Sequence, residues 1–223
     1  MQQFSITMWP TTLPDAERVQ NELRHQVIRD DDYGSIRTVA GIDAGYEGDQ
    51  ARAVAVVLAF PSLQPIEYAI AYRPVPLPYI PGYLSFREGP AILAAIQALQ
   101  TPPDLLIFDG QGIAHPRRLG IASHIGVLAN IPAIGCAKSR LIGRHAAVPD
   151  QRGAQVPLTD GDEVIGAVLR TRPGTKPVFI STGHRVSLAS AVHFVMECTT
   201  RYRLPETTRA ADGLASHGKL PNL

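Results

Sequence analysis

Two aspartates stand at the ends of predicted strands, a position from which carboxylates of distant segments can meet. Asp43 closes the run 37–43, and Asp109 closes the apolar run 104–109. Each is followed by a glycine-containing turn, which leaves room for a ligand beside the backbone. In an α/β sheet such strand ends border the crevice where ligands bind. The alternative interpretation makes both aspartates ordinary turn or helix-cap residues.

Two further carboxylates can reach the same point. Glu88 stands at the entry to a predicted helix, and Asp212 lies on the C-terminal helix. Three or four converging carboxylates cannot all remain ionised without a cation between them. Carboxylate and water oxygens are the ligands that Mg²⁺ and Mn²⁺ prefer, so this set predicts a site for these ions. Two such ions can activate water and stabilise the leaving oxygen of a phosphodiester.

The stretch 110–149 contains no Asp or Glu but five Lys and Arg residues, although the net charge of the chain is only +1. A one-sided positive charge suits a polyanionic ligand such as a nucleic acid. Alternatively, this stretch is mostly buried and its arginines are scattered over the surface. Lys138 follows the predicted strand 132–136, where an ammonium can neutralise phosphate oxygens. His115 is either a group that contacts phosphate or orients the nucleophile, or an ordinary surface histidine.

The run 78–88 combines prolines with aromatic and branched side chains. Prolines flank Tyr79-Ile80, and they restrict its backbone so that both side chains are held out rigidly. Apolar side chains presented in this way can wedge between stacked bases and push a nucleotide out. Gly82 and Gly110 would then offer bare backbone to the extruded base. The alternative is a loop tucked onto the core by its own aromatic residues.

The surrounding sequence predicts the framework that positions these residues. Residues 1–14 lack a period and predict a flexible arm, after which Asp15 is expected to cap a helix. Three strand-like runs with short connections predict an antiparallel meander: 37–43, 52–60 and 66–72. Later strands are expected at 104–109, 132–136, 164–169 and 178–180, between helices at 91–99, 119–129, 187–199 and 206–216. This order predicts an α/β fold with a ribonuclease-H-like mixed sheet and helices on both faces.

Composition limits the class of protein. With 45% hydrophobic and 18% charged residues, the 223-residue chain predicts one globular domain over residues 15–217 and a short tail, 218–223. The longest apolar run, 53–60, is too short to cross a membrane. Cys136 and Cys198 are too few for a disulfide framework and predict buried thiols. We therefore expect a soluble, cytoplasmic protein, monomeric because it shows no coiled-coil pattern.

Seven segments, in order along the chain, are similar to the motifs of the endonuclease V family of deoxyinosine 3′ endonucleases. The segments are 41–45, 78–88, 109–120, 122–124, 135–138, 182–185 and 209–212. The likeness covers residues 15–217. It implies a ribonuclease-H-like fold and Mg²⁺-dependent hydrolysis, with Mn²⁺ as a substitute, of DNA that holds a deaminated base, chiefly deoxyinosine. Cleavage is implied at the second phosphodiester 3′ to the lesion, leaving a 3′-hydroxyl and a 5′-phosphate.

The resemblance also implies residue roles. The metal ligands would be Asp43, Glu88, Asp109 and Asp212, and the catalytic residues Asp43, Glu88, Asp109, His115 and Lys138. The residues expected to bind substrate are Tyr79, Ile80, Pro81, Gly82, Leu84, Gly110, Arg117, Arg118, Gly120, Ile121 and Leu141. The chain departs from the family pattern where Gln111 replaces a common His and Cys136 a usual Val. Two alternatives remain: an enzyme of the same fold acting on inosine in RNA, and a lesion-binding protein that does not cut.

Overall fold

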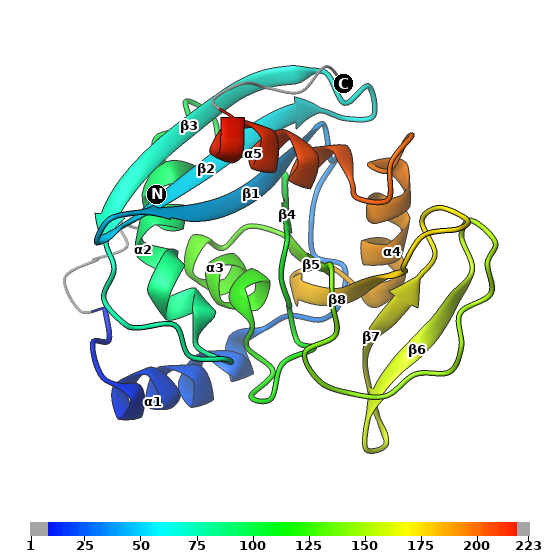
Figure 1. The fold of residues 1–223 in the computed structure, drawn as a ribbon, viewed down its shortest axis with the longest axis horizontal. Helices are drawn as coiled ribbons and strands as arrows, with labels where there is room; N and C mark the ends of the chain where they lie inside the picture. The colour runs from blue at the N-terminus through cyan, green and yellow to red at the C-terminus, as the bar shows by residue number, and fades with distance from the viewer. Residues whose placement is uncertain (1–8, 218–223) are drawn as a thin grey trace.

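One mixed β-sheet organises the part of the chain that the computed structural model describes, residues 9–217 (Figure 1). Its strands lie in the order β3-β2-β1-β4-β5-β8-β7-β6. Their bounds are β1 (Thr38–Glu47), β2 (Gln50–Ala59), β3 (Pro65–Pro74), β4 (Leu105–Phe108), β5 (Ala133–Ala137), β6 (Gln155–Asp160), β7 (Glu163–Leu169) and β8 (Val178–His184). Residues 1–8 of the expected arm and the expected tail 218–223 lie outside the described residues.

The strand pairing confirms the predicted meander and brings two predicted site residues together. β2 is antiparallel to both β1 and β3, whereas β4 runs parallel to β1 and β5 parallel to β4. In the β1–β4 register, Ile42 stands beside Phe108. The next residues, Asp43 and Asp109, therefore lie at the same level of the sheet on neighbouring parallel segments. Asp109 directly follows β4, but Asp43 lies inside β1, which continues to Glu47 along β2, so the prediction that Asp43 closes its strand was wrong.

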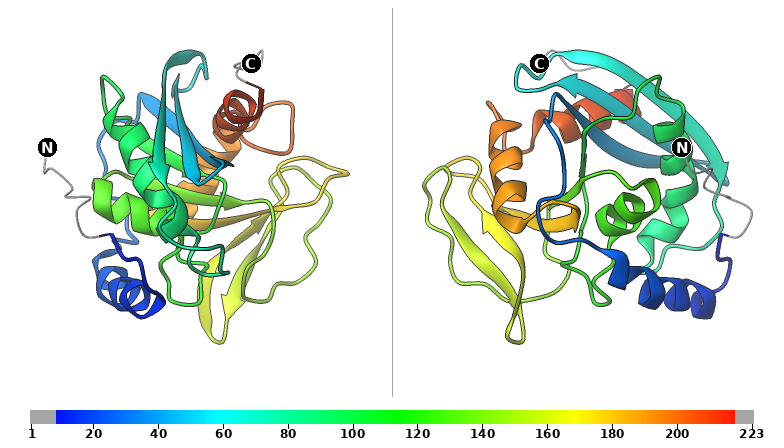
Figure 2. Two further views of the ribbon diagram at one scale, coloured as in Figure 1. Left: turned by 60° about the vertical axis from the view of Figure 1, so that its left-hand side comes forward. Right: turned by 180° about the vertical axis from the view of Figure 1, so that it is seen from behind.

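Helices cover both faces of the sheet, as expected (Figure 2). The helices are α1 (Leu13–Leu23), α2 (Leu84–Gln97), α3 (Ile121–Ala129), α4 (Leu188–Glu197) and α5 (Glu206–His217), and a 3₁₀ turn, Arg24–Gln26, follows α1. Alternation along β2 separates the two cores. Val54 and Val56 belong to the cluster beneath α4 and α5, while Ala53 and Ala55 belong to the cluster beneath α2 and α3. None of the described helices is both long and apolar enough to span a membrane.

The first helix begins earlier than predicted. Thr12, and not Asp15, is its N-cap, and the Thr12 hydroxyl accepts a hydrogen bond from the Asp15 backbone N–H at 3.3 Å. The described end of the expected arm is also packed. Trp9 lies 5.4 Å from His124, ring centre to ring centre, in a stacked arrangement. Residues 9–14 thus belong to the folded domain.

Helix α2 also begins earlier than predicted, at Leu84 and not near residue 91, so Glu88 lies inside the helix and not at its entry. Pro90 obscured this start because proline inside a helix removes the hydrogen bond to the carbonyl four residues before it. That carbonyl belongs to Phe86, and it accepts a hydrogen bond from Trp9 Nε1 at 2.7 Å. The N-terminal segment therefore satisfies the group that the proline leaves unpaired.

Strand β6 was not predicted. Pro157 lies within it, and a proline argues against a central strand. The structure resolves the conflict by topology, because β7 is the only strand among the described residues that pairs with β6, which forms an edge of the sheet. On its other side β6 makes a single bridge, between Thr159 and Arg144. β8 is likewise longer than the predicted run 178–180, since it continues to His184 along β5.

Candidate active site

Four carboxylates predicted to share a site influence one another electrostatically. Asp43 in β1 and Asp109 directly after β4 lie side by side, α5 brings Asp212 over β1, and α2 brings Glu88 from the other face. Burial raises the pKa of Asp43 to about 6, and the negative charges of Asp212 and Asp109 add to the rise. The ionised form of Asp43 is therefore destabilised in this site, and a nearby cation would stabilise it.

Glu88 is the most deeply buried member of the set. Burial raises its pKa to about 7, and the charges of Asp43 and Asp109 contribute further. The Tyr46 hydroxyl donates a hydrogen bond to Glu88 Oε1 at 2.6 Å and acts in the opposite direction, favouring the ionised form. At physiological pH this carboxyl is poised between its neutral and charged states.

Lys138 is the basic member of the site. Its Nζ lies 2.6 Å from Asp109 Oδ2. Burial lowers the pKa of Lys138, but the hydrogen bond and the charge of Asp109 outweigh this effect and the net pKa is raised, so the ammonium stays charged. One positive charge thus faces Asp43, Asp109 and Asp212, which leaves the cluster negative.

The donor set suits a hard divalent cation without forming a finished cage. All the acidic donors are oxygens, and burial together with neighbouring negative charge makes the ionised forms of Asp43 and Glu88 unfavourable, which a bound cation would relieve. Within residues 9–217, however, no three His, Cys, Asp or Glu side chains stand close enough together to make a complete metal site. The residues present fit a cation that keeps several water ligands, which is the habit of Mg²⁺.

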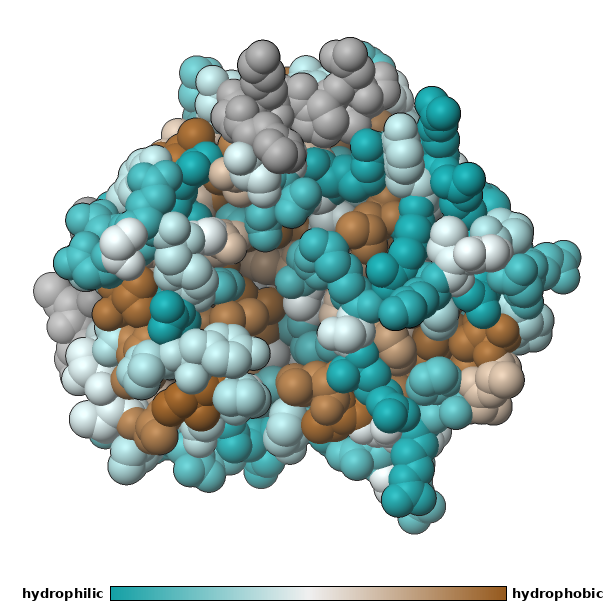
Figure 3. Space-filling model, viewed as in Figure 1, coloured by the Kyte–Doolittle hydropathy of each residue, from teal (hydrophilic) through white to brown (hydrophobic). Residues whose placement is uncertain are grey.

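A cavity of about 210 Å³ opens directly beside Asp109. Its walls come from the loop before α2, the turn after β4, the start of α3 and the loop after β5. Predicted residues in this lining are Tyr79, Pro81, Gly82, Leu84, Asp109, Gly110, His115, Gly120, Ile121 and Leu141. Figure 3 shows apolar residues gathered around the centre and lower left of the face seen in Figure 1, among hydrophilic ones. An apolar cavity against a carboxylate can hold a flat base next to the reacting groups.

The loop that carries Tyr79 is held at its base and free at its tip. Tyr79 is 65% exposed, whereas Phe86 is buried and belongs to a cluster that Tyr83 packs against. Tyr79, in the first half of the 78–88 run, is therefore exposed, whereas the second half packs on the core as the alternative interpretation expected. Gly82, which has a φ of +85°, marks the change, and its carbonyl accepts hydrogen bonds from Gln20, His115 and Arg117.

His115 is buried, and both of its ring nitrogens are engaged. Nδ1 accepts from the Arg117 backbone N–H at 3.2 Å, so Nε2 carries the proton and donates to the Gly82 carbonyl at 3.0 Å. Burial lowers the pKa of His115 to about 4, and the charges of Arg117 and Arg118 oppose protonation as well. The contacts of this neutral ring tie the turn after β4 to the Tyr79 loop.

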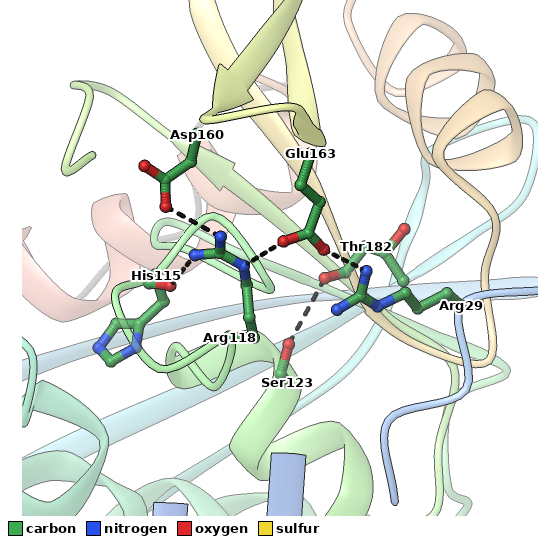
Figure 4. Close-up of polar contacts among 7 residues, drawn as sticks. All are labelled: Arg29, His115, Arg118, Ser123, Asp160, Glu163 and Thr182. Atoms are coloured by element: carbon green, nitrogen blue, oxygen red, sulfur yellow. Dashed lines mark hydrogen bonds and ion pairs between the residues drawn. The ribbon is translucent and has the colours of Figure 1, made fainter. Parts of the chain in front are cut away.

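The cavity wall does not include Ile80, Arg117 or Arg118. Arg117 stacks on the Tyr83 ring at 4.4 Å and bonds to Gln20 and Gly82. Arg118 donates to Glu163, Asp160 and the His115 carbonyl, and Glu163 also accepts from Arg29 (Figure 4). Both arginines are occupied by protein groups, so part of the acid-free stretch holds the fold together.

Sequence reasoning missed three residues that support the site. Tyr46 bonds to Glu88, Arg203 donates to the Lys138 carbonyl at 2.7 Å, and Gln111 Nε2 donates to the Ser139 carbonyl at 2.9 Å. The backbone of Lys138 and Ser139 is thus held by two side-chain hydrogen bonds, one from Arg203 and one from Gln111. Of the three, Gln111 alone carried a hint, because it lies between Gly110 and Gly112 in the turn after Asp109.

Comparison with known proteins places the chain. A family model described as Endonuclease V matches residues 21–213. The relative from Roseiflexus sp. (strain RS-1), named Endonuclease V, is 62% identical over 213 residues, which is 96% of this chain and 96% of the relative. The Endonuclease V from Trichormus variabilis is 56% identical over 220 residues, covering 97% of this chain and all of the relative (100%).

Solved structures agree. The crystal structure of Endonuclease V from Streptomyces avermitilis matches with a TM-score of 0.90 at 44% identity over 95% of each chain. That of Endonuclease V from Ciona intestinalis, in complex with a 23mer DNA containing an inosine followed by a ribo-adenosine, matches with a TM-score of 0.80 at 28% identity, covering 92% of this chain and 96% of that one. These matches confirm the ribonuclease-H-like α/β fold. The chain belongs to the endonuclease V family.

Proposed function

We propose that this endonuclease binds a deaminated purine, chiefly deoxyinosine in DNA, and hydrolyses the second phosphodiester on its 3′ side. The products would carry a 3′-hydroxyl and a 5′-phosphate. The observation that carries the proposal is that Asp109 belongs to both parts of the site: it lines the base-sized cavity and also pairs with Lys138 in the acidic cluster. A base held in the cavity therefore places its own strand beside the carboxylates.

The cofactor in this proposal is Mg²⁺, for which Mn²⁺ can substitute. Asp43, Asp109, Glu88 and Asp212 would hold it, because they supply oxygen ligands and a net negative charge that burial has made unfavourable. When bound, the ion supplies Lewis-acid stabilisation of charge on phosphate oxygens and a more acidic water. Asp43 and Glu88 must lose their protons before the ion can bind, because only the ionised carboxylate is a metal ligand.

Other residues orient and stabilise the strand. The Lys138 ammonium can move from Asp109 to a non-bridging phosphate oxygen, where it offsets the charge that grows in the transition state. His115 would act through its hydrogen bond to the Gly82 carbonyl, which would fix the position of the Tyr79 loop beside the bound base. Exposed Tyr79 would fill the gap that the extruded nucleotide leaves.

Cleavage of matched oligonucleotides tests the proposal. We expect the protein, in Mg²⁺, to cut deoxyinosine-containing DNA at the second phosphodiester 3′ to the lesion. The undamaged duplex of the same sequence should stay intact. Inosine-containing RNA of the same sequence is measured in parallel, and faster cleavage of the RNA would assign that polymer as the substrate. Binding without cleavage under all metal conditions would instead support the lesion-binding alternative.

A variant at the loop tip tests the wedge separately. Tyr79→Ala should weaken binding of deoxyinosine duplex about 5- to 100-fold, because an aromatic ring contributes about 1–3 kcal/mol by stacking on a base. The midpoint of Mg²⁺ titration should not change, since Tyr79 lies in the cavity wall and not among the carboxylates. Tyr68→Ala, an exposed tyrosine on β3, is the matched control and should bind like the wild type. A Tyr79 defect confined to the metal titration would contradict the wedge.

The compartment proposed is the reducing cytoplasm. Cys136 and Cys198 are both free and buried, and burial raises the pKa of each thiol, which keeps it unreactive. This supports a chain that folds without disulfide formation.

A further inference from the structure

Strand β3 forms an edge of the sheet, and among residues 9–217 no strand pairs with its outer side. It is ten residues long, with prolines only at its two ends, Pro65 and Pro74. Edge strands are usually protected from pairing with another chain by charged side chains, above all lysine, by an internal proline, by a bulge or by a covering segment. β3 has no lysine and no internal proline, its two charged residues are Glu67 and Arg73, and its pairing with β2 is irregular only near its start, opposite Val57 and Leu58.

One face of β3 is apolar and exposed. The side chains of Ile66, Tyr68, Ile70 and Tyr72 are between 37% and 58% exposed. They alternate along the strand and so share a face, the one that Val54 and Val56 of β2 occupy. Helix α5 covers β1 and β2 on this side and stops short of β3. In Figure 1 β3 runs along the outer margin of the sheet, beyond α5.

The sequence of β3 is self-complementary. Residues 67–73 read Glu-Tyr-Ala-Ile-Ala-Tyr-Arg, which is symmetric about Ile70 except that Glu67 mirrors Arg73. In an antiparallel pair of two such strands, a residue i faces residue 140 − i of the other copy. Tyr68 then faces Tyr72, Ile70 faces itself, and Glu67 faces Arg73 twice, once on each side of the centre. Aromatic, β-branched and opposite-charge pairs are those that stabilise antiparallel strands.

We infer that β3 is a homodimer interface, in which two copies pair their β3 edges antiparallel about Ile70 and form one continuous sheet. A two-fold axis requires a surface that is complementary to itself, and the symmetric strand meets that requirement in both shape and charge. Each Arg73, which now donates to the neighbouring Tyr72 carbonyl at 2.7 Å, would reach Glu67 of the second copy. The inference replaces our expectation of a monomer, and it does not depend on the proposed substrate.

A second copy fits this edge better than a nucleic acid does. The strand's two charges, Glu67 and Arg73, cancel, whereas a surface for DNA carries an excess of positive charge. The cavity lining also contains no residue of β3, so pairing at this edge leaves the cavity and the acidic cluster open.

Charge reversal at two positions tests both the interface and its register. Sedimentation velocity of the full chain should show a concentration-dependent dimer for the wild type. Arg73→Glu places Glu opposite Glu, and Glu67→Arg places Arg opposite Arg, so each variant alone should raise the dimer dissociation constant about tenfold or more. An equimolar mixture of the two variants restores both opposite-charge pairs and should recover the dimer. Because Glu67 also accepts the Gln100 backbone N–H, Ile70→Lys serves as a second disrupting variant.

Controls separate the interface from folding. Val164→Lys changes an exposed apolar residue of β7 and should leave the dimer unchanged. Cleavage activity and thermal unfolding show whether Arg73→Glu and Ile70→Lys are folded. A wild type that stays monomeric at all concentrations overturns the inference, and so does a dimer that survives Ile70→Lys. A dimer that Ile70→Lys disrupts but Arg73→Glu does not would overturn the register.

Discussion

Two groups of carboxylates in this protein face opposite electrostatic conditions. Around Arg118, Asp160 and Glu163 each accept a hydrogen bond from a guanidinium, and Arg29 adds another to Glu163 (Figure 4). Burial alone would raise the pKa of Glu163, but these arginines outweigh it and lower the pKa. In the acidic cluster, burial and like charge raise the pKa of Asp43 and Glu88, and the opposing charges of Lys138 near Asp43 and of Arg87 near Glu88 do not outweigh them.

The difference separates a structural network from a functional one. A fold minimises its free energy by pairing carboxylates with guanidinium groups, as in the Arg118 network. Carboxylates left short of positive charge at a strand edge cost stability, and such cost is typical of sites that await a ligand. Charge shortage and not acidity alone therefore distinguishes Asp43 from Asp160.

The largest difference between the two groups should appear in cleavage activity when one carboxylate of each group is neutralised. Asp43→Asn should lower single-turnover cleavage of deoxyinosine DNA at saturating Mg²⁺ by about 10³-fold or more, because it removes one of the carboxylates that we propose to hold the ion. It should still bind the lesion, since the cavity lining does not include Asp43. Asp160→Asn, the matched control, should cut within about threefold of the wild-type rate. Equal losses in the two variants would contradict the distinction.

The pH dependence of Mg²⁺ affinity should follow the raised pKa values. Asp43 ionises near pH 6 and Glu88 near pH 7, so each competes with protons for the metal in that range. We expect the Mg²⁺ dissociation constant, measured by titration calorimetry, to rise by up to about tenfold per pH unit for each carboxyl as pH falls from 7.5 to 5.5. Glu88→Gln should flatten the upper part of this profile. An affinity that does not change over this interval would show that neither carboxyl binds the ion.

The smallest effect concerns stability, and here the two groups should differ in sign. Folding raises the pKa of Glu88 from 4.5 to about 7. Ionisation of Glu88 therefore does not affect the free energy of unfolding below pH 4.5, where the group is protonated in both states, and lowers it by the full amount above pH 7. Glu88→Gln should therefore raise the metal-free stability at pH 8 by about 1–3 kcal/mol and leave it unchanged at pH 4. The lowered pKa of Glu163 works the other way, and it contributes stability that is lost on acidification. Glu163→Gln should lower stability at pH 8 by about 0.5–1 kcal/mol, because this side chain is partly exposed.

Denaturant unfolding with EDTA present measures both values. The control is the same pair of variants in saturating Mg²⁺, where Glu88→Gln should lose its advantage because the wild type gains the ion's binding energy. A Glu88→Gln variant less stable than the wild type without metal would mean that the Tyr46 hydrogen bond outweighs the repulsion.

Local pattern was sufficient for much of the architecture. Strand-like runs with short connections predicted the meander of β1, β2 and β3, and the apolar residues between Asp104 and Asp109 predicted β4. The helix expected at 187–199 is α4, and Ser187 at the start of that range is its N-cap. The prediction failed at prolines, which locally disfavour a helix or strand that a distant part of the chain makes possible. At Pro90, Trp9 donates a hydrogen bond to the Phe86 carbonyl that the proline leaves unpaired, so the helix continues through it. Pro157 is the second case, since only its place at the sheet edge makes it tolerable.

For the site, the sequence by itself determined which residues carry charge and which strands they belong to or follow, because residue type and strand-forming pattern are local properties. It did not determine where β1 ends, since pairing with β2 extends that strand past Asp43 to Glu47. Only the tertiary structure decided how those charges are used. Asp43 and Asp109 meet because the β1–β4 register aligns them, whereas Arg118, from the same basic stretch as Lys138, is taken up by Asp160 and Glu163. The physical reason is that a charge acts through its neighbours, and the neighbours of a buried group come from segments far away in the chain.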